Sequence, residues 1–232
     1  MPPLMWVWHG RRYLGAAHGV AGILFVLWNC PSSVVEPYSE DLVKTLEWLV
    51  DLQDSTGNWP SKAPADAINA EHNNELVQWC HGATGILILL SKASLHREWI
   101  ILDPKLHEKV NFAIRKGAHI VYRHGLLTKG VGICHGVAGS VYALLAASRV
   151  LDTFKARGGP LTDRNTKYLR RAVHLAVLAT ESENLTKNGE MRTPDRPWSL
   201  YEGSAGMCCA WADVLCSLTG RDPGGVPGFD DL

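Results

Sequence analysis

Cys134-His135-Gly136-Val137-Ala138-Gly139 is the stretch that decides the fold, because versions of it occur four times along the chain. Each version has a Gly-x-x-Gly core followed by an apolar run. The other three are Ala17-His18-Gly19-Val20-Ala21-Gly22, Cys80-His81-Gly82-Ala83-Thr84-Gly85 and Tyr201-Glu202-Gly203-Ser204-Ala205-Gly206. Their uneven spacing does not suit a short solenoid repeat, but it suits helical hairpins joined by loops of variable length.

Two kinds of helix are predicted between and after these motifs. Apolar residues recur at helical spacing in the amphipathic stretches 41–52, 104–122 and 164–179, whereas the runs 86–90 and 141–147 are apolar on most sides. A helix that is apolar all round is buried, and an amphipathic helix covers it. No segment alternates with period two for long enough to indicate a sheet. We therefore expect an all-α fold, an α/α barrel of inner and outer helices.

The sequence predicts one domain over residues 1–219, followed by a flexible tail at 220–232. The long connections are rich in Pro, Gly and Asn, and they are expected at 30–38, 54–74, 157–162 and 183–197.

Composition bears on whether the chain binds nucleic acid, which redox compartment it occupies and whether it contacts a membrane. With 23 basic and 23 acidic residues and no Lys/Arg run, the chain is not expected to bind nucleic acid. The six cysteines are unevenly placed, which favours a reducing, cytoplasmic location over a disulfide framework. The apolar run 20–28 is too short for a transmembrane helix. Peripheral contact with the plasma membrane stays open, although no lipidation motif or polybasic cluster supports it.

The register of the four motifs predicts a metal site. The residues just before the first glycine are Ala17-His18, Cys80-His81, Cys134-His135 and Tyr201-Glu202. If the inner helices point their N-terminal ends at one pole of the barrel, these side chains converge there. Two thiols and one imidazole form a Cys₂His zinc set, whose open fourth position is typical of a catalytic site. The motif spacing alone leaves either His135 or His81 as the nitrogen ligand.

These motifs resemble those of the LanC-like proteins, the eukaryotic relatives of bacterial lanthionine cyclases, and most nearly the third paralogue of that family. The resemblance rests on residues 16–22, 79–82 and 132–136, and on Arg192-Thr193-Pro194-Asp195 ahead of residues 199–203. It implies an α/α toroid of seven helical hairpins. With four glycine motifs, the chain is expected to be the C-terminal portion, an incomplete ring of about four hairpins.

The resemblance also implies a function, the zinc-dependent addition of glutathione to dehydroalanine or dehydrobutyrine in peptides or proteins. The zinc ligands would be Cys80, Cys134 and His135, and the active-site acid would be His18. The glutathione contacts would be Lys129, Arg192, Thr193, Pro194 and Asp195. Two departures bear on activity. An acidic residue from the earlier half of the cyclases is absent, and Asn73 or Asn74 replaces an Arg of the better-known relatives.

Other interpretations compete with this one. The chain could be a non-catalytic scaffold or sensor that binds zinc and glutathione. A carbohydrate-processing α/α barrel would need two facing carboxylates, and Glu202 is the only carboxylate at a motif position. Taken singly, Lys129 could be a solvated loop charge, residues 193–195 an ordinary turn, and His18 a capping residue.

Overall fold

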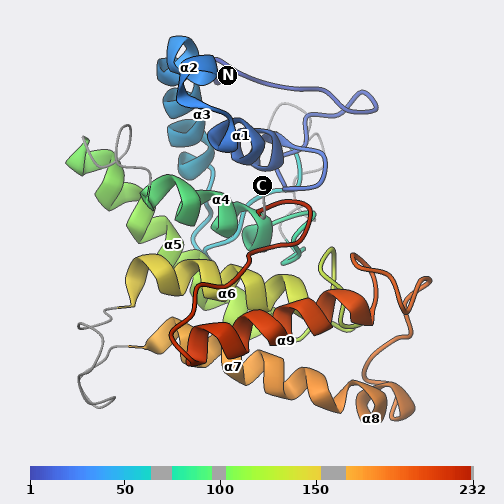
Figure 1. Ribbon diagram of the computed structural model, residues 1–232. Helices are drawn as coiled ribbons and strands as arrows, with labels where there is room; N and C mark the ends of the chain where they lie inside the picture. Colours follow the sequence, from blue (N-terminus) through green and yellow to red (C-terminus); the bar gives the residue numbers. More distant parts are fainter. Residues whose placement is uncertain (64–74, 96–102, 153–165, 231–232) are drawn as a thin grey trace. The chain divides into compact units, whose positions relative to one another are not determined.

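The computed structural model describes residues 1–63, 75–95, 103–152 and 166–230. Within these ranges the regular structure is helical, and β-pairing is limited to the isolated bridges Trp8–Arg11 and Tyr13–Lys62. The prediction of an all-α fold is therefore confirmed (Figure 1). The helices pack as two compact units, Met1–Val121 and Tyr122–Asp231.

The first unit has two apolar helices and two amphipathic ones. Helix α1 (Val20–Asn29) packs against α4 (Ala83–Leu95), and every residue from Ala83 to Ser94 except Lys92 is buried. Helices α3 (Ser39–Asp51) and α5 (Pro104–His124) each bury one face only. The expected alternation of inner and outer helices is present here. Between α1 and α3 lie two short helices, α2 (Ser32–Val35) and η1 (Glu36–Tyr38).

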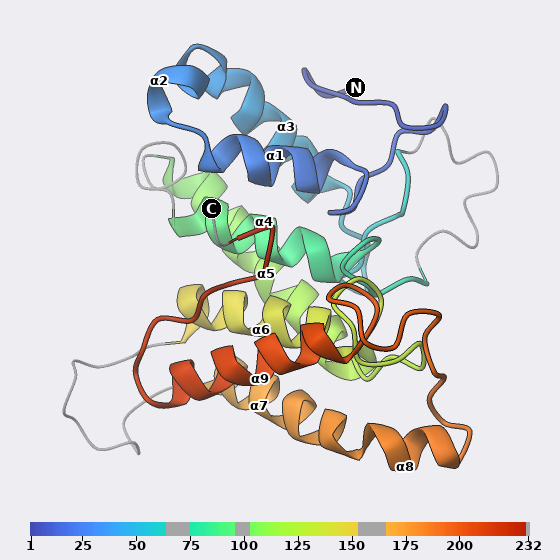
Figure 2. The ribbon, with the colours of Figure 1, turned by 45° about the vertical axis from the view of Figure 1, so that its right-hand side comes forward.

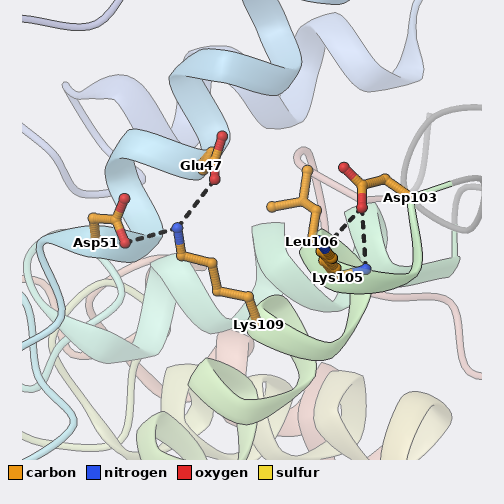
Figure 3. Close-up of polar contacts among 6 residues, drawn as sticks. All are labelled: Glu47, Asp51, Asp103, Lys105, Leu106 and Lys109. Carbon is orange, nitrogen blue, oxygen red and sulfur yellow. Dashed lines mark hydrogen bonds and ion pairs between the residues drawn. The ribbon is translucent and has the colours of Figure 1, made fainter.

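An ion network joins the outer helices α3 and α5 in this unit (Figure 3). Lys109 Nζ lies 3.1 Å from Glu47 Oε1 and 2.8 Å from Asp51 Oδ1. Partial burial acts to lower the pKa of Lys109, but hydrogen bonds with Asp51 and Glu47 outweigh it and raise that pKa. The carboxylate of Asp103 caps α5 by accepting the backbone N–H groups of Lys105 and Leu106. The ion pairs link α3 to α5, and Asp103 caps the first turn of α5.

The second unit is built on α6 (Val137–Leu151), α7 (Lys167–Leu178) and α9 (Ser204–Leu218), which lie side by side in Figures 1 and 2. In α6, every residue from Val137 to Ser148 except Ala146 is buried. Helix α7 continues through η5 (Ala179–Glu181) into α8 (Ser182–Lys187).

The buried carboxylate of Asp152 caps the N-terminus of α7. Both oxygens of Asp152 accept hydrogen bonds from Tyr168 N at 3.1 Å, and one accepts from Leu169 N at 2.9 Å. The N-terminal N–H groups of α7 are therefore capped by Asp152, the residue that follows the last residue of α6.

The predicted amphipathic stretches match the helices to within a few residues: 41–52 is α3 and 104–122 is α5, while 164–179 contains α7, with 164 and 165 outside the described residues. The predicted connections 30–38 and 183–197 are partly helical, because the first contains α2 and η1, and the second begins inside α8. Pro37 explains the first case, since its fixed φ suits the opening turn of η1.

The segment after residue 219 makes specific contacts. Gly224 N and Gly225 N donate to the carboxylate of Asp213, at 2.8 and 3.0 Å, and the Tyr201 hydroxyl donates to Pro227 O at 3.0 Å. Val226 and Phe229 are buried. The boundary at 219 and the flexibility of the tail stay predictions, but in this structure the segment lies against its own unit. Among the described residues, no helix combines the length and apolarity that a membrane span requires.

Candidate functional site

A loop precedes each of the four motif helices and ends at the first glycine of the motif. We call these loops loop 1 (13–19), loop 2 (76–82), loop 3 (130–136) and loop 4 (197–203). In loops 1, 3 and 4 the first N–H of the following helix donates to the carbonyl that opens the loop. These bonds are Val20 N–Tyr13 O at 3.1 Å, Val137 N–Gly130 O at 3.1 Å and Ser204 N–Pro197 O at 2.8 Å. The capping glycines also share one extended conformation, with φ of −124°, −124° and −120°. The motif register inferred from sequence therefore corresponds to a shared backbone path.

The second glycine of the motif has a steric role. A Cβ on Gly22, Gly85 or Gly206 would overlap the backbone carbonyl of Ala16, Trp79 or Leu200 respectively. Glycine at this position lets the loop fold back onto the first turn of its helix. The side chains just before the first glycine are thereby held at the helix N-terminus.

Loop 2 departs from the other three at its capping glycine. Gly82 has φ +91°, in the left-handed region that favours glycine. The fully buried side chain of Asn58 closes this loop, because its Oδ1 accepts from Ala83 N at 2.8 Å and its Nδ2 donates to Leu76 O at 3.2 Å. Asn58 was not predicted, because it lies outside the repeat and carries no periodic signal.

Loops within a unit pack in pairs. Ala16 N donates to Trp79 O at 3.4 Å, and a Cβ on Gly15 would overlap the carbonyl of Cys80. In the second unit, Cys134 N donates to Tyr201 O at 2.7 Å, and Gly132 lies against the backbone of Glu202. Loop 1 thus packs against the backbone of loop 2, and loop 3 packs in the same way against the backbone of loop 4.

The predicted zinc ligands lie at the ends of loops 2 and 3. Cys80 is buried, and its Sγ lies 3.6 Å from Gln78 Oε1. Cys134 and His135 are consecutive and half-buried at the start of α6. None of the six cysteines, all of them among the described residues, forms a disulfide, so the sulfur atoms of Cys80 and Cys134 are not lost to disulfide bonds. Two thiols and an imidazole are donors that suit zinc.

His18, the predicted acid, is exposed in loop 1 and lies in a cluster of rings. Its imidazole stacks on the indole of Trp8, with centroids 5.8 Å apart and ring planes 10° from parallel. The rings of Tyr13 and His81 lie 6.0 and 6.5 Å from it. The structure thus brings His18 beside the residue that follows Cys80.

The predicted glutathione residues come together in the second unit. Arg192 N donates to Thr128 O at 2.8 Å, and a Cβ on Gly130 would lie 3.3 Å from Pro194 Cδ. The segment bearing Lys129 therefore runs beside the one bearing Arg192. Lys129, Arg192, Thr193 and Asp195 are exposed, and Pro194 is half-buried. Exposed cations on paired segments can bind carboxylates. Asn73 and Asn74 lie outside the described residues.

Comparisons with known proteins agree with these motifs. The family described as lanthionine synthetase C-like protein matches residues 1–224. LanC-like protein GCL1 of Arabidopsis thaliana is 34% identical over 223 residues, which are 96% of this chain and 45% of the relative. Glutathione S-transferase LANCL1 of Danio rerio is 31% identical over 222 residues, which are 95% of this chain and 47% of the relative. The chain therefore spans about half the length of these curated relatives.

Proposed function

Because the chain belongs to the lanthionine synthetase C-like family, we propose that it adds glutathione, with the help of zinc, to dehydroalanine or dehydrobutyrine residues of peptides or proteins. The observation that carries the proposal is the repeated motif, which places Cys80-His81 just before α4 and Cys134-His135 just before α6. The name of the Danio rerio relative, glutathione S-transferase, supports the transferase class.

In this proposal Cys80, Cys134 and His135 hold the zinc ion. His135 rather than His81 is proposed as the nitrogen donor, as the resemblance of the motifs to the family implies. Zinc bound by these residues would lower the pKa of an incoming thiol and supply it as a thiolate. Cysteines that form no disulfide, as all six do here, fit the cytoplasmic location that we propose for the chain.

Glutathione offers two carboxylates and one ammonium group, and the segments around Lys129 and Arg192 have matching charges. Lys129 and Arg192 would bind the carboxylates, Arg192 through two parallel hydrogen bonds. Asp195 would pair with the ammonium group, while Thr193 and Pro194 set the path of the chain between them. Since the backbone of Arg192 is bonded to Thr128, the two cations are held on neighbouring segments before glutathione binds.

The remaining step belongs to His18. When the thiolate sulfur bonds to Cβ of the dehydroamino acid, the π electrons of the C=C bond move onto Cα and its carbonyl as an enolate. The imidazolium of His18 then gives its proton to Cα, and the proton released by the thiol restores the acid. The net result is addition of S–H across the double bond, and no other reactant is consumed.

The proposal is tested by mass spectrometry of a dehydroalanine peptide incubated with glutathione and the zinc-loaded chain. We expect an adduct with the wild type, and a rate lower by about 10²-fold or more with His18→Ala, at unchanged zinc content. Arg192→Ala should mainly raise KM for glutathione. Arg221→Ala, at an exposed arginine of the same unit, should behave as wild type. Zinc and glutathione binding without any adduct would instead support the scaffold or sensor function.

A further inference from the structure

A tight hairpin precedes loop 1 and presents Trp8. The backbone groups of Trp8 and Arg11 exchange two hydrogen bonds, at 2.8 and 3.0 Å. Between them His9 has φ +48° and Gly10 has φ +70°. Positive φ at both central residues is typical of the type I′ turn, whose twist matches that of the flanking strands. Histidine is one of the non-glycine residue types that adopt positive φ more often than most.

The hairpin places the Trp8 indole against the imidazole of His18. The two rings are nearly parallel, at the 5.8 Å and 10° described above, and the ring of His9 meets Trp8 edge-on, 4.7 Å away. The Trp8 residue remains 51% exposed. Parallel-displaced and edge-on contacts of this kind stabilise one relative orientation of aromatic rings.

The contacts of the His18 ring in this structure are with other rings. Among the described residues, the imidazole of His18 has stacking and edge contacts with Trp8, Tyr13 and His81, but no hydrogen bond to a protein group. A general acid must present one nitrogen to the reacting atom, and histidines that do so are usually oriented by a hydrogen-bonded partner. For His18, the neighbour in near-parallel contact is the Trp8 ring.

We propose that Trp8 is a positioning residue, which holds the His18 imidazole in one rotamer and so fixes the face from which Cα is protonated. The consequence for protonation rests on the proposed function, whereas the ring orientation does not. Addition to dehydroalanine creates a stereocentre at Cα. An acid held on one side yields one configuration, and protonation by water from both sides yields a mixture.

The orientation is measured first, without any reaction. In a chain labelled with ¹³C and ¹⁵N in histidine, three-bond couplings to Cγ report χ1 of His18, whose signals are identified by their loss in His18→Gln. We expect a single staggered rotamer in the wild type and in Trp8→Phe, and averaged couplings in Trp8→Ala. Tyr38→Ala removes another exposed aromatic of the same unit, 61% exposed, and should match the wild type. A single His18 rotamer in Trp8→Ala would overturn the proposal.

The product then tests the consequence. With a dehydroalanine peptide and glutathione, Trp8→Ala should lower kcat by roughly tenfold or more, leave KM for glutathione unchanged, and give both configurations at Cα. A single configuration formed at the wild-type kcat would refute the role of Trp8 in proton delivery. A wild type that forms no adduct would refute the proposed function, and the rotamer measurement would still decide whether Trp8 positions His18.

Discussion

Gly132→Ala should test how tightly the paired loops are packed, because it adds one methyl group between loops 3 and 4. A Cβ at this position would lie 2.6 Å from Glu202 Cα and closer still to the Glu202 carbonyl. The neighbouring backbone is held by the 2.7 Å hydrogen bond from Cys134 N to Tyr201 O. The added methyl group would therefore meet the backbone of Glu202, and backbone cannot move aside as a flexible side chain can.

The cost follows from that distance. Non-bonded carbons prefer separations of about 3.5–4.0 Å, so the two loops must move apart by roughly 1 Å. Overpacking of this kind costs about 1–3 kcal/mol, and more where backbone must shift. The φ of Gly132 is outside the left-handed region, so alanine can adopt it. Alanine also lowers the conformational entropy of the unfolded chain, which raises the free energy of unfolding by about 0.4–1 kcal/mol. We expect a net loss of about 2 kcal/mol in the free energy of unfolding.

Urea unfolding followed by circular dichroism, at fixed zinc concentration, measures this loss. Gly224→Ala is the matched control in the same unit, since its Cβ would lie 3.6 Å from Asp213 Oδ1 at ordinary contact distance. The control should be as stable as the wild type or slightly more stable. If Gly132→Ala and Gly224→Ala unfold at the same urea concentration with the same m value, our account of the loop pairing is wrong.

Two further predictions concern buried polar groups outside the repeat. Asn58→Ala should lower the free energy of unfolding by about 2–4 kcal/mol in the same urea assay, because Ala83 N and Leu76 O lose their partner; a change below about 0.5 kcal/mol would contradict this. Burial raises the pKa of Asp152, and its hydrogen bonds with Leu169 N and Tyr168 N oppose this only in part. The folded state therefore binds the Asp152 proton more tightly than the unfolded state does. Stability should therefore fall as pH rises through the range just above the ordinary aspartate pKa, about pH 4, and Asp152→Asn should flatten that part of the profile; an unchanged slope would exclude Asp152 as its source.

Much of the helical pattern could be predicted because it depends on local periodicity. Each of these helices is indicated by residues of its own segment. Helices α3 and α5 show an amphipathic pattern, and α4 and α6 contain apolar runs. The Gly-x-x-Gly motifs were equally informative, because close backbone approach at Gly22, Gly85 and Gly206 excludes other side chains. Prediction therefore succeeded where one short segment carries the whole physical constraint.

The features that were missed depend on contacts between distant segments. The side chain of Asn58 closes loop 2 from outside the repeat, so nothing near Gly82 reveals it. Trp8 reaches His18 through a hairpin whose two central residues, His9 and Gly10, are not the Asn-Gly or Asp-Gly pair that usually signals such a turn. The cap that Asp152 supplies to α7 likewise joins residues separated by a long connection.

Zinc content tests the central claim most directly. We would measure zinc per chain by mass spectrometry for the wild type, Cys134→Ala and the control Cys208→Ala, which removes an exposed thiol on α9. The account predicts one zinc ion in the wild type and in the control, and its loss in Cys134→Ala. A wild type without zinc, or a Cys134→Ala variant that keeps it, would contradict the assignment of the metal ligands.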